Sequence, residues 1–432
     1  MREAKRSAVG TEKSERNGHL RRVVVTGLGA VTPLGNSVPE FWSNVIKGQS
    51  AVSHITLFDP APLPTRFAAE VRDFDPSAAI GKKDARKMDR FAQFALVAAE
   101  QAVKDAALDI SDANRDDIGI IMGSGIGGIL TIEQQHKIML EQGPGRLSPF
   151  LIPMLISNIA PGLISMKLKV RGPTQTAVSA CASSNNAIGD AFRTIQYGDA
   201  EAMICGGSEA PITPLAVGGF CAMRALSTRN DDPQHASRPF DRDRDGFVIG
   251  EGGGALVLEE LESALGRGAR IYAEIIGYGK SSDAYHMVAP DPEARGVKLA
   301  MQRAIRDARI EADDIDYINA HATSTDLGDS AETQAVHQVF GEHAKTVPLS
   351  SNKSMFGHAL GAAGALEGIC TVLSVHEGII PPTINYQHVD PACDLDCVPN
   401  LSRKADVKVA MSNSFGFGGH NAVLVFRKFS QN

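Results

Sequence analysis

The chain has 432 residues, of which 43% are hydrophobic and 22% are charged, and its formal net charge is −7 at pH 7. This length allows a large interior and suits one large or two fused α/β units. The negative charge argues against nucleic acid as the main partner, and the composition is that of an ordinary soluble protein.

Residues 1–20 are charged and lack apolar periodicity, which predicts a disordered arm. From residue 21 onward, β-prone runs alternate with amphipathic helical stretches, and this alternation predicts α/β layers with mostly buried strands. A first series covers 21–270 and a second series of similar order covers 271–430. We therefore expect two duplicated halves packed as one body, although the letters repeat too weakly to establish the duplication.

The longest apolar stretch, "SPFLIPMLISNIAPGLISMKL" at 148–168, contains Pro153, Asn158 and Pro161. These residues make it a poor membrane span, so we interpret it as buried helix and loop. The six cysteines form no CxxC pair, and the N-terminus does not resemble a signal peptide. Reduced thiols and a cytoplasmic location follow as expectations.

Cys181 lies in "AVSACASSNNAIGDAF", where a β-prone run changes into a helical pattern with a Ser/Asn opening. A helix start favours the thiolate and lowers the thiol pKa, and its backbone N–H groups can hold an oxyanion. A free cysteine is more often a small buried hydrophobic residue, so this one needs partners before it is a nucleophile.

Two histidines follow β-like runs and lie beside small residues: His321 in "DYINAHATST" and His358 in "NKSMFGHALGAAGA". A lone histidine is usually a satisfied surface or core residue. Two at matching strand exits, together with a poised thiol, favour a cysteine/histidine acyl-transfer site. Lys353 and Glu332 are the nearest charged residues; they either form a solvated pair or orient the imidazoles and keep one of them neutral.

Other chemical signals fail. "VVVTGLGAVTPLG" reads GxGxxT and lacks the acidic residue that a dinucleotide site needs. Neither a P-loop nor a zinc spacing is present, and "CDLDC" at 393–397 has the wrong spacing for a zinc pair. We expect no cofactor and no metal ion.

Four motifs occur in a fixed order along the chain: "SACASS", "NAHATST", "NKSMFGH" and "NSFGFGGHN". In this combination they resemble the β-ketoacyl-acyl carrier protein synthases of the thiolase-like superfamily, closest to the synthase II type. The resemblance covers about 21–429. It implies an α/β thiolase-like fold of two duplicated halves, layered α-β-α-β-α, and the elongation of fatty acyl chains, suited to long chains.

The resemblance also implies roles for individual residues. Cys181 matches the acyl-accepting nucleophile, and its backbone N–H and that of Phe417 match the oxyanion hole. His321 and His358 match the pair that binds the malonyl thioester carbonyl and stabilises the enolate after carbon dioxide leaves, with Lys353 and Glu332 behind them. Further matches are Phe417 as a gate, Thr323 and Thr325 as ligands of the phosphopantetheine arm, and Ile126 and Phe415 as substrate-binding residues.

The implied partners are an acyl carrier protein and a second copy of the chain in a homodimer, with no membrane span. An acidic carrier suits the basic residues Lys83, Arg86 and Lys87 in "GKKDARKMDR", and Arg224 matches a family contact. An exposed, solvated helix start explains the basic cluster equally well.

Two positions depart from the family pattern: Ala322 replaces a glycine, and His420 stands where many members have threonine. Neither removes a catalytic group, and both leave the rate and acyl preference open. Relatives on the same fold fit less well. Thiolases have a second cysteine in the C-terminal Gly-rich loop, and synthase III has Asn in place of His358.

Two alternatives stay open. A stand-alone polyketide ketosynthase would use the same extender chemistry. A non-catalytic subunit of the chain-length-factor type would lack the cysteine, so Cys181 argues against it.

Overall fold

In this computed structural model, which describes residues 20–430, ten strands form one hydrogen-bonded series in the order β10-β9-β13-β14-β8-β1-β7-β6-β4-β5. The predicted arm of residues 1–20 lies, except for Leu20, outside the described residues. Five strands belong to the N-terminal half: β1 (Val23–Val31), β4 (Ile118–Gly123), β5 (Thr174–Ala177), β6 (Ala202–Glu209) and β7 (Gly252–Glu260). Five belong to the C-terminal half: β8 (Ala273–Ser282), β9 (Tyr317–Asn319), β10 (Leu349–Ser350), β13 (Val409–Gly416) and β14 (His420–Arg427).

The two halves share one topology. Within each half the strands lie in the order third, second, fourth, fifth, first along the chain. In each, the second strand pairs in parallel with the third and fourth, and the fifth pairs antiparallel with the fourth and first. The halves join where β1 and β8 pair antiparallel, with Val23 opposite Ile275. The predicted duplication and thiolase-like layering are thereby confirmed.

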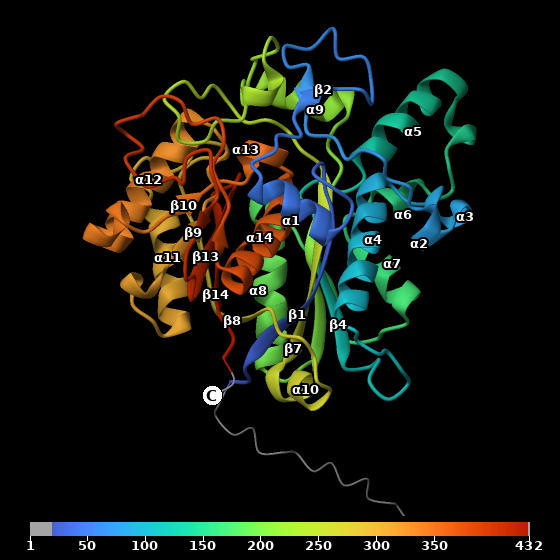
Figure 1. Cartoon of the computed structure of the whole chain (residues 1–432). Helices are drawn as coiled ribbons and strands as arrows, with labels where there is room; N and C mark the ends of the chain where they lie inside the picture. The colour runs from blue at the N-terminus through green and yellow to red at the C-terminus, as the bar shows by residue number, and fades with distance from the viewer. Residues whose placement is uncertain (1–19, 431–432) are drawn as a thin grey trace, which may run out of the picture.

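Helices α8 (Ser183–Gln196) and α14 (Ala363–Glu377) form the central layer (Figure 1). They contact each other, and α8 packs on β4 and β6 while α14 packs on β13 and β7. Every residue of α14 from Ala363 to Val375 is buried, as expected for a helix whose residues in this stretch are mostly small or apolar.

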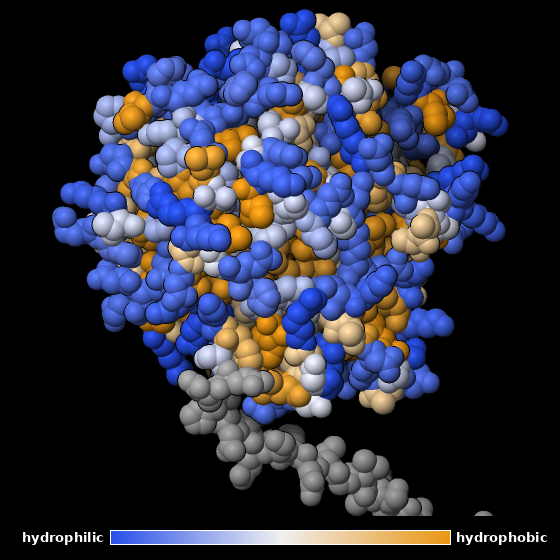
Figure 2. Space-filling view, in the orientation of Figure 1, coloured by the Kyte–Doolittle hydropathy of each residue, from blue (hydrophilic) through white to orange (hydrophobic). Residues whose placement is uncertain are grey.

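The outer layers consist of helices that cover the outer faces of the sheet (Figure 1). On the N-terminal half these are α4 (Arg90–Asp105) and α7 (Ile159–Leu168), and on the C-terminal half α11 (Arg295–Ala308) and α12 (Asp326–Phe340). In α11 the buried residues recur at helical spacing, and the other face is polar. The face seen in Figure 2 is mostly hydrophilic, with hydrophobic side chains in smaller groups.

The remaining elements are shorter, except for the 14-residue helix α5. The other helices are α1 (Val38–Ile46), α2 (Ser77–Ile80), α3 (Lys82–Ala85), α5 (Ile129–Gln142), α6 (Leu151–Leu155), α9 (Pro214–Ala222), α10 (Leu261–Gly266) and α13 (Lys353–Phe356). Single 3₁₀ turns are η1 (Pro144–Arg146), η2 (Ala180–Ala182), η3 (Pro233–His235), η4 (Ala312–Asp314), η5 (Gly341–Lys345) and η6 (Leu360–Ala362). Two small sheets pair β2 (Ser53–His54) with β3 (Phe67–Ala68), and β11 (Ile379–Ile380) with β12 (Arg403–Lys404).

Three local expectations need correction. The stretch "DARKMDRFAQFALVAAEQAVKDAAL" at 84–108 predicts one amphipathic helix, but the structure interrupts it, because Asp89 accepts a hydrogen bond from the Phe91 N–H and starts α4 anew. The sequence pattern did not predict strand β7, because three glycines at its start obscure the buried apolar run that follows them. The stretch 148–168 forms α6 and α7, but Ile152 and Met166 are 60% and 65% exposed rather than buried. Within 20–430, none of the helices is both long and apolar enough to cross a bilayer.

Candidate active site

Cys181 lies in η2, between β5 and α8, which confirms the predicted strand-to-helix turn. Ala180, before it, has φ 50°, so the backbone doubles back just ahead of the cysteine. The Ser183 hydroxyl closes this turn: it accepts from the Ser179 N–H (2.9 Å) and donates to the Ala180 carbonyl (2.7 Å). The serine thus ties the turn before α8, and the N-cap residue Ala182 makes no side-chain cap.

The Cys181 thiol is only 6% exposed, and burial raises its pKa to about 12. The expectation of a lowered pKa is therefore wrong for this state, because desolvation of the thiolate outweighs the helix start. Lys353 and the backbone N–H groups of Phe417 and Cys181 act in the opposite direction. The two N–H groups lie beside the sulfur, and therefore near the carbonyl oxygen of an acyl group carried on it, which is the atom that becomes an oxyanion.

Gly416 lets the Phe417 backbone come this close. A Cβ at this position would lie 2.5 Å from the Ser179 carbonyl oxygen and 3.1 Å from the Cys181 nitrogen. Real Cβ atoms do not approach a carbonyl oxygen at 2.5 Å, so the close packing of β13 on η2 depends on glycine here.

His321, after β9, and His358, just before η6, bring their rings together with centroids 5.4 Å apart and planes at 87°. Both rings and Cys181 line one cavity of about 500 Å³. Burial and the nearby Lys353 cation lower the pKa of both histidines well below 6.5, so the rings are neutral at neutral pH. Among the described residues, His321 Nδ1 and both His358 ring nitrogens are buried without a hydrogen-bond partner.

Lys353 is fully buried and forms an ion pair with Glu367. The solvated pair of Lys353 and Glu332 is therefore wrong, since both side chains are buried and the partner of the lysine is a different glutamate. Burial raises the pKa of Glu367 to about 7, while Lys353 opposes that rise. Glu367 lies inside the apolar pattern of α14, and no local signal distinguished it in the sequence.

Glu332 holds the backbone that carries His321. Its carboxylate accepts hydrogen bonds from the N–H groups of His321 (2.9 Å) and Ala322 (2.7 Å) and from the Asn413 side chain (2.9 Å). Glu332 therefore acts on His321 through the main chain, in line with the alternative in which it orients an imidazole rather than forming a solvated pair.

The predicted substrate-binding residues line the same cavity. Ile126, Phe415, Phe417, Thr323 and Thr325 all belong to its wall. The hydroxyls of the two threonines are 3.1 Å apart, and the Phe415 ring lies 5.5 Å from that of His321. The wall thus contains both apolar side chains and hydroxyls.

Buried Arg244 holds the loop that bears the two threonines, and sequence reasoning missed it. It donates to the carbonyls of Thr325 (3.2 Å) and Asp326 (3.1 Å) and pairs with Asp390 at 2.5 Å. Its signal in the sequence was a charged residue inside the otherwise unexplained run "FDRDRDGF".

The predicted docking residues separate into two places. Arg224 follows α9, is exposed and lines the cavity. Lys83 and Arg86 are exposed on and after α3, and Lys87 is half-buried beside Asp84 and the Phe150 ring. None of these three lines the cavity, so the structure does not bring them to Arg224's side of the site.

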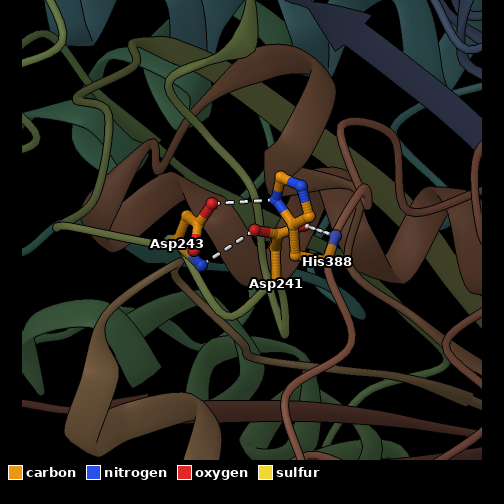
Figure 3. Close-up of side chains that lie close together, drawn as sticks. All are labelled: Asp241, Asp243 and His388. Carbon is orange, nitrogen blue, oxygen red and sulfur yellow. Dashed lines mark hydrogen bonds and ion pairs between the residues drawn. The ribbon is translucent and has the colours of Figure 1, made fainter.

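Asp241, Asp243 and His388 offer atoms at metal-ligand spacing (Figure 3). These atoms are already engaged: Asp243 pairs with His388 Nδ1 at 2.8 Å, and Asp241 accepts from the N–H groups of Asp243 (2.9 Å) and His388 (2.7 Å). The group ties two loops together and gives no reason to assign a metal ion.

Comparison with protein families gives two matches that follow each other along the chain. The N-terminal domain of beta-ketoacyl synthase matches residues 20–264, and the C-terminal domain matches residues 272–387. The chain belongs to the β-ketoacyl synthase family. The resemblance read from the four motifs is therefore confirmed.

Among β-ketoacyl synthases, this chain is 53% identical over 413 residues to 3-oxoacyl-[acyl-carrier-protein] synthase 2 of Synechocystis sp., covering 96% of this chain and 99% of that one. It is 54% identical over 409 residues to the protein of the same name from Staphylococcus aureus strain N315, covering 95% and 99%.

Solved structures give the same fold. A β-ketoacyl synthase from Burkholderia phymatum superposes with a TM-score of 0.88 at 39% identity, and the ishigamide ketosynthase/chain length factor with 0.90 at 37%. A type II polyketide ketosynthase solved with its acyl-carrier protein superposes with 0.89 at 36%. Each comparison covers 95% of this chain and 100% of the other.

Proposed function

We propose that this β-ketoacyl synthase elongates fatty acyl chains by condensing malonyl-carrier protein with an acyl group held on Cys181. The observation that supports this most strongly is the shared cavity, in which a thiol under two backbone N–H donors faces two neutral imidazoles. The two relatives above 50% identity that carry the synthase 2 name support the fatty acid assignment.

The first half-reaction is a thioester exchange. The Cys181 sulfur attacks the acyl carbon of the acyl-carrier thioester, and the N–H groups of Cys181 and Phe417 stabilise the oxyanion. The bond to the carrier sulfur breaks, and that sulfur takes the proton that the cysteine gives up. Because the thiol pKa is raised, the proton leaves as attack proceeds rather than beforehand.

The second half-reaction forms the carbon–carbon bond. Neutral His321 and His358 donate ring N–H bonds to the malonyl thioester oxygen as the bond to carbon dioxide breaks and its electrons form an enolate. The enolate carbon attacks the acyl carbon on Cys181, and the cysteine sulfur leaves and takes a proton from solvent. Neutral rings suit this step, because they are already aimed and stay uncharged beside Lys353.

The other residues of the wall receive roles in the same proposal. Thr323 and Thr325 bind the pantetheine arm through their hydroxyls. Ile126 and Phe415 contact the acyl chain. The Phe417 side chain acts as a gate and changes its position after the first half-reaction and before the second. Lys353 and Glu332 act behind the histidines, through the electrostatic field and the main chain respectively.

A polyketide ketosynthase remains the alternative, because neighbouring solved structures include polyketide proteins at 36–37% identity. Purified enzyme supplied with fatty acyl and with polyketide carriers in separate reactions distinguishes the two. We expect turnover with a saturated fatty acyl group on the carrier to be at least tenfold faster than turnover with a polyketide on the carrier. Preference for the polyketide carrier would reverse the assignment.

We include a homodimer in the proposal. Strand β5 ends the strand order with exposed Thr174 and Gln175, and exposed Ile152 and Met166 lie on α6 and α7 in the same region. An unpaired edge beside apolar side chains is typical of a subunit interface. Light scattering is expected to give twice the chain mass, and Ile152→Glu with Met166→Glu to give a monomer; a monomeric wild type would refute this.

We also propose a cytoplasmic location, which the free state of all six cysteines supports. We further propose that the carrier protein docks on the basic residues Lys83, Arg86, Lys87 and Arg224. Lys83→Glu with Arg86→Glu should raise the KM for carrier substrates several-fold and leave kcat unchanged. Lys404→Glu, an exposed lysine on β12, is the matched control. An unchanged KM in the double variant would remove α3 from the docking surface.

A further inference from the structure

Glu209, the last residue of β6, is a buried carboxylate that the proposed chemistry does not use. Both of its oxygens accept hydrogen bonds, and every partner is a donor. The donors are Ser124 Oγ (2.9 Å), Gly125 N (2.6 Å), Ile126 N (3.1 Å), Gly127 N (3.3 Å) and Gly361 N (3.0 Å). Four belong to the loop after β4, and the fifth belongs to η6, more than 230 residues further along the chain.

These donors flank two walls of the cavity. Ile126 and Leu360 pack with Cys181 in one apolar cluster, and all three line the cavity. The Ile126 N–H bonds Glu209 directly, and Gly361, the neighbour of Leu360, bonds it from the other side. One carboxylate therefore holds two apolar walls at a fixed separation around the nucleophile.

The packing around this carboxylate leaves little freedom. A Cβ at Gly361 would lie 2.3 Å from the Gly125 nitrogen and 2.5 Å from Glu209 Oε2. The backbones of Gly125 and Gly361 lie in direct contact, and Glu209 accepts a hydrogen bond from the N–H of each. Movement of either wall must therefore break bonds to Glu209.

The duplicated topology shows what is special about this contact. Strands β6 and β13 are equivalent, and they end at Glu209 and Gly416. Gly416 approaches the Cys181 turn, where N–H groups stay available to the sulfur. Glu209 approaches the Gly361 turn, where its carboxylate accepts the hydrogen bond of the Gly361 N–H. The same junction is left open for chemistry in one half and closed by a carboxylate in the other.

We propose that Glu209 is a positioning residue that fixes the Ile126 and Leu360 walls and thereby sets which acyl chains Cys181 accepts. This inference rests on the proposed acyl-transfer function. A short acyl group needs only the sulfur and the oxyanion donors, whereas a long chain must pass between the two walls. Loosening the walls therefore penalises long chains selectively.

The test compares butyryl- and palmitoyl-carrier protein as acyl donors, with intact mass reporting acylation of Cys181. Glu209→Gln turns amide hydrogens toward N–H donors and so breaks part of the clamp. We expect the palmitoyl rate to fall at least tenfold relative to the butyryl rate, with malonyl decarboxylation within threefold of wild type. An equal fall for both chain lengths, or no change in their ratio, would overturn the proposal.

Glu259→Gln is the matched control. Glu259 is equally buried and contacts Thr26 and Arg267, but it pairs with Ala202 at the opposite end of the β6–β7 ladder. Its chain-length ratio should equal that of wild type, and a shift like that of Glu209→Gln would also overturn the proposal.

Ser124→Ala removes one donor to Glu209 and serves if Glu209→Gln does not fold. It should move the ratio in the same direction by a smaller factor, and an unchanged ratio would count against the clamp. Wild-type acylation is measured first: a wild type without acyl-enzyme refutes the proposed function, whereas an acylated wild type with an unselective Glu209→Gln refutes only the role of Glu209.

Discussion

The two halves of the molecule contain the same turn with different contents. In each, a one-turn 3₁₀ helix begins at a residue with positive φ and leads into a central helix: Ala180 (φ 50°) opens η2 and Leu360 (φ 46°) opens η6. The middle residue is Cys181 in the first and Gly361 in the second. The first turn carries Cys181, the proposed nucleophile, and leaves its N–H groups available, whereas the second turn is hydrogen-bonded to Glu209 and forms part of the cavity wall.

The comparison shows that the two halves share a topology but contribute different groups to the cavity. The N-terminal half supplies Cys181, and the C-terminal half supplies both histidines and the Phe417 N–H. The pocket exists only where the halves meet. We therefore expect mutations in one half to impair acylation of Cys181 and mutations in the other half to impair decarboxylation of the malonyl group.

The largest effect is expected from the histidines. His321→Ala and His358→Ala should each lower condensation about 10³-fold, because the enolate oxygen loses a donor, while acylation of Cys181 stays within tenfold of wild type. Product formation and intact mass, measured on the same samples, report the two steps. Equal loss of both steps would break the division between the halves.

Lys353→Met should lower the free energy of unfolding by about 3–5 kcal/mol, since it leaves the Glu367 carboxylate buried without its ion pair. Replacing both partners, Lys353→Met with Glu367→Leu, should restore much of that loss. The exposed pair Lys137–Glu141, at 3.9 Å, is the control, and Lys137→Met should cost less than about 0.5 kcal/mol. Urea unfolding of wild type and the three variants checks this, and equal losses at both lysines would contradict it.

Alanine at the two junction glycines compares the turns directly. Gly416→Ala forces the Cys181 turn away from Phe417, so acylation by a short acyl carrier should fall about 100-fold. Gly361→Ala displaces the Glu209 contact instead and should lower short-chain acylation less than tenfold while lowering long-chain acylation more. Quenched acylation assays with a short and a long acyl carrier measure the rates of both variants. The same dependence of rate on chain length in the two variants would remove the distinction between the turns.

The smallest effect concerns pH. Because burial raises the pKa of Cys181 to about 12, the thiolate fraction should grow with pH throughout the accessible range. Alkylation by iodoacetamide should rise about tenfold per pH unit from pH 7 to 9 without a plateau, since the thiolate is the nucleophile. Mass spectrometry of the Cys181 peptide follows the rate. A plateau below pH 8 would show that the N–H groups and Lys353 outweigh burial.

The parts that could be predicted are those with local signals. The turn at Cys181 follows from a β-prone run meeting a helical pattern, and the alternation of runs indicates the α/β layers. Glu209 could not be found in this way, because its partners come from distant segments: Gly361 is 152 residues from Glu209. Glu367 lies close to its partner Lys353 in the sequence, but nothing in the mostly apolar run around it indicates a buried ion pair. The direction of the Cys181 pKa depends on burial, which a local pattern does not contain.

The exposed apolar side chains of α6 and α7 teach a related lesson. Hydrophobicity in the sequence predicts that Ile152 and Met166 are covered, but it does not say whether the cover comes from the same chain. The single chain leaves both side chains exposed, and the proposed homodimer is what would cover them.

The most direct test of the account is intact mass measurement of wild type and Cys181→Ala after mixing with palmitoyl-carrier protein, then with malonyl-carrier protein. We expect the wild type to gain one acyl mass, which malonyl-carrier protein discharges as a β-ketoacyl product, and the variant to gain none. Acylation of the variant, or a wild type that no acyl carrier of any chain length modifies, would contradict the assignment of Cys181 as the nucleophile.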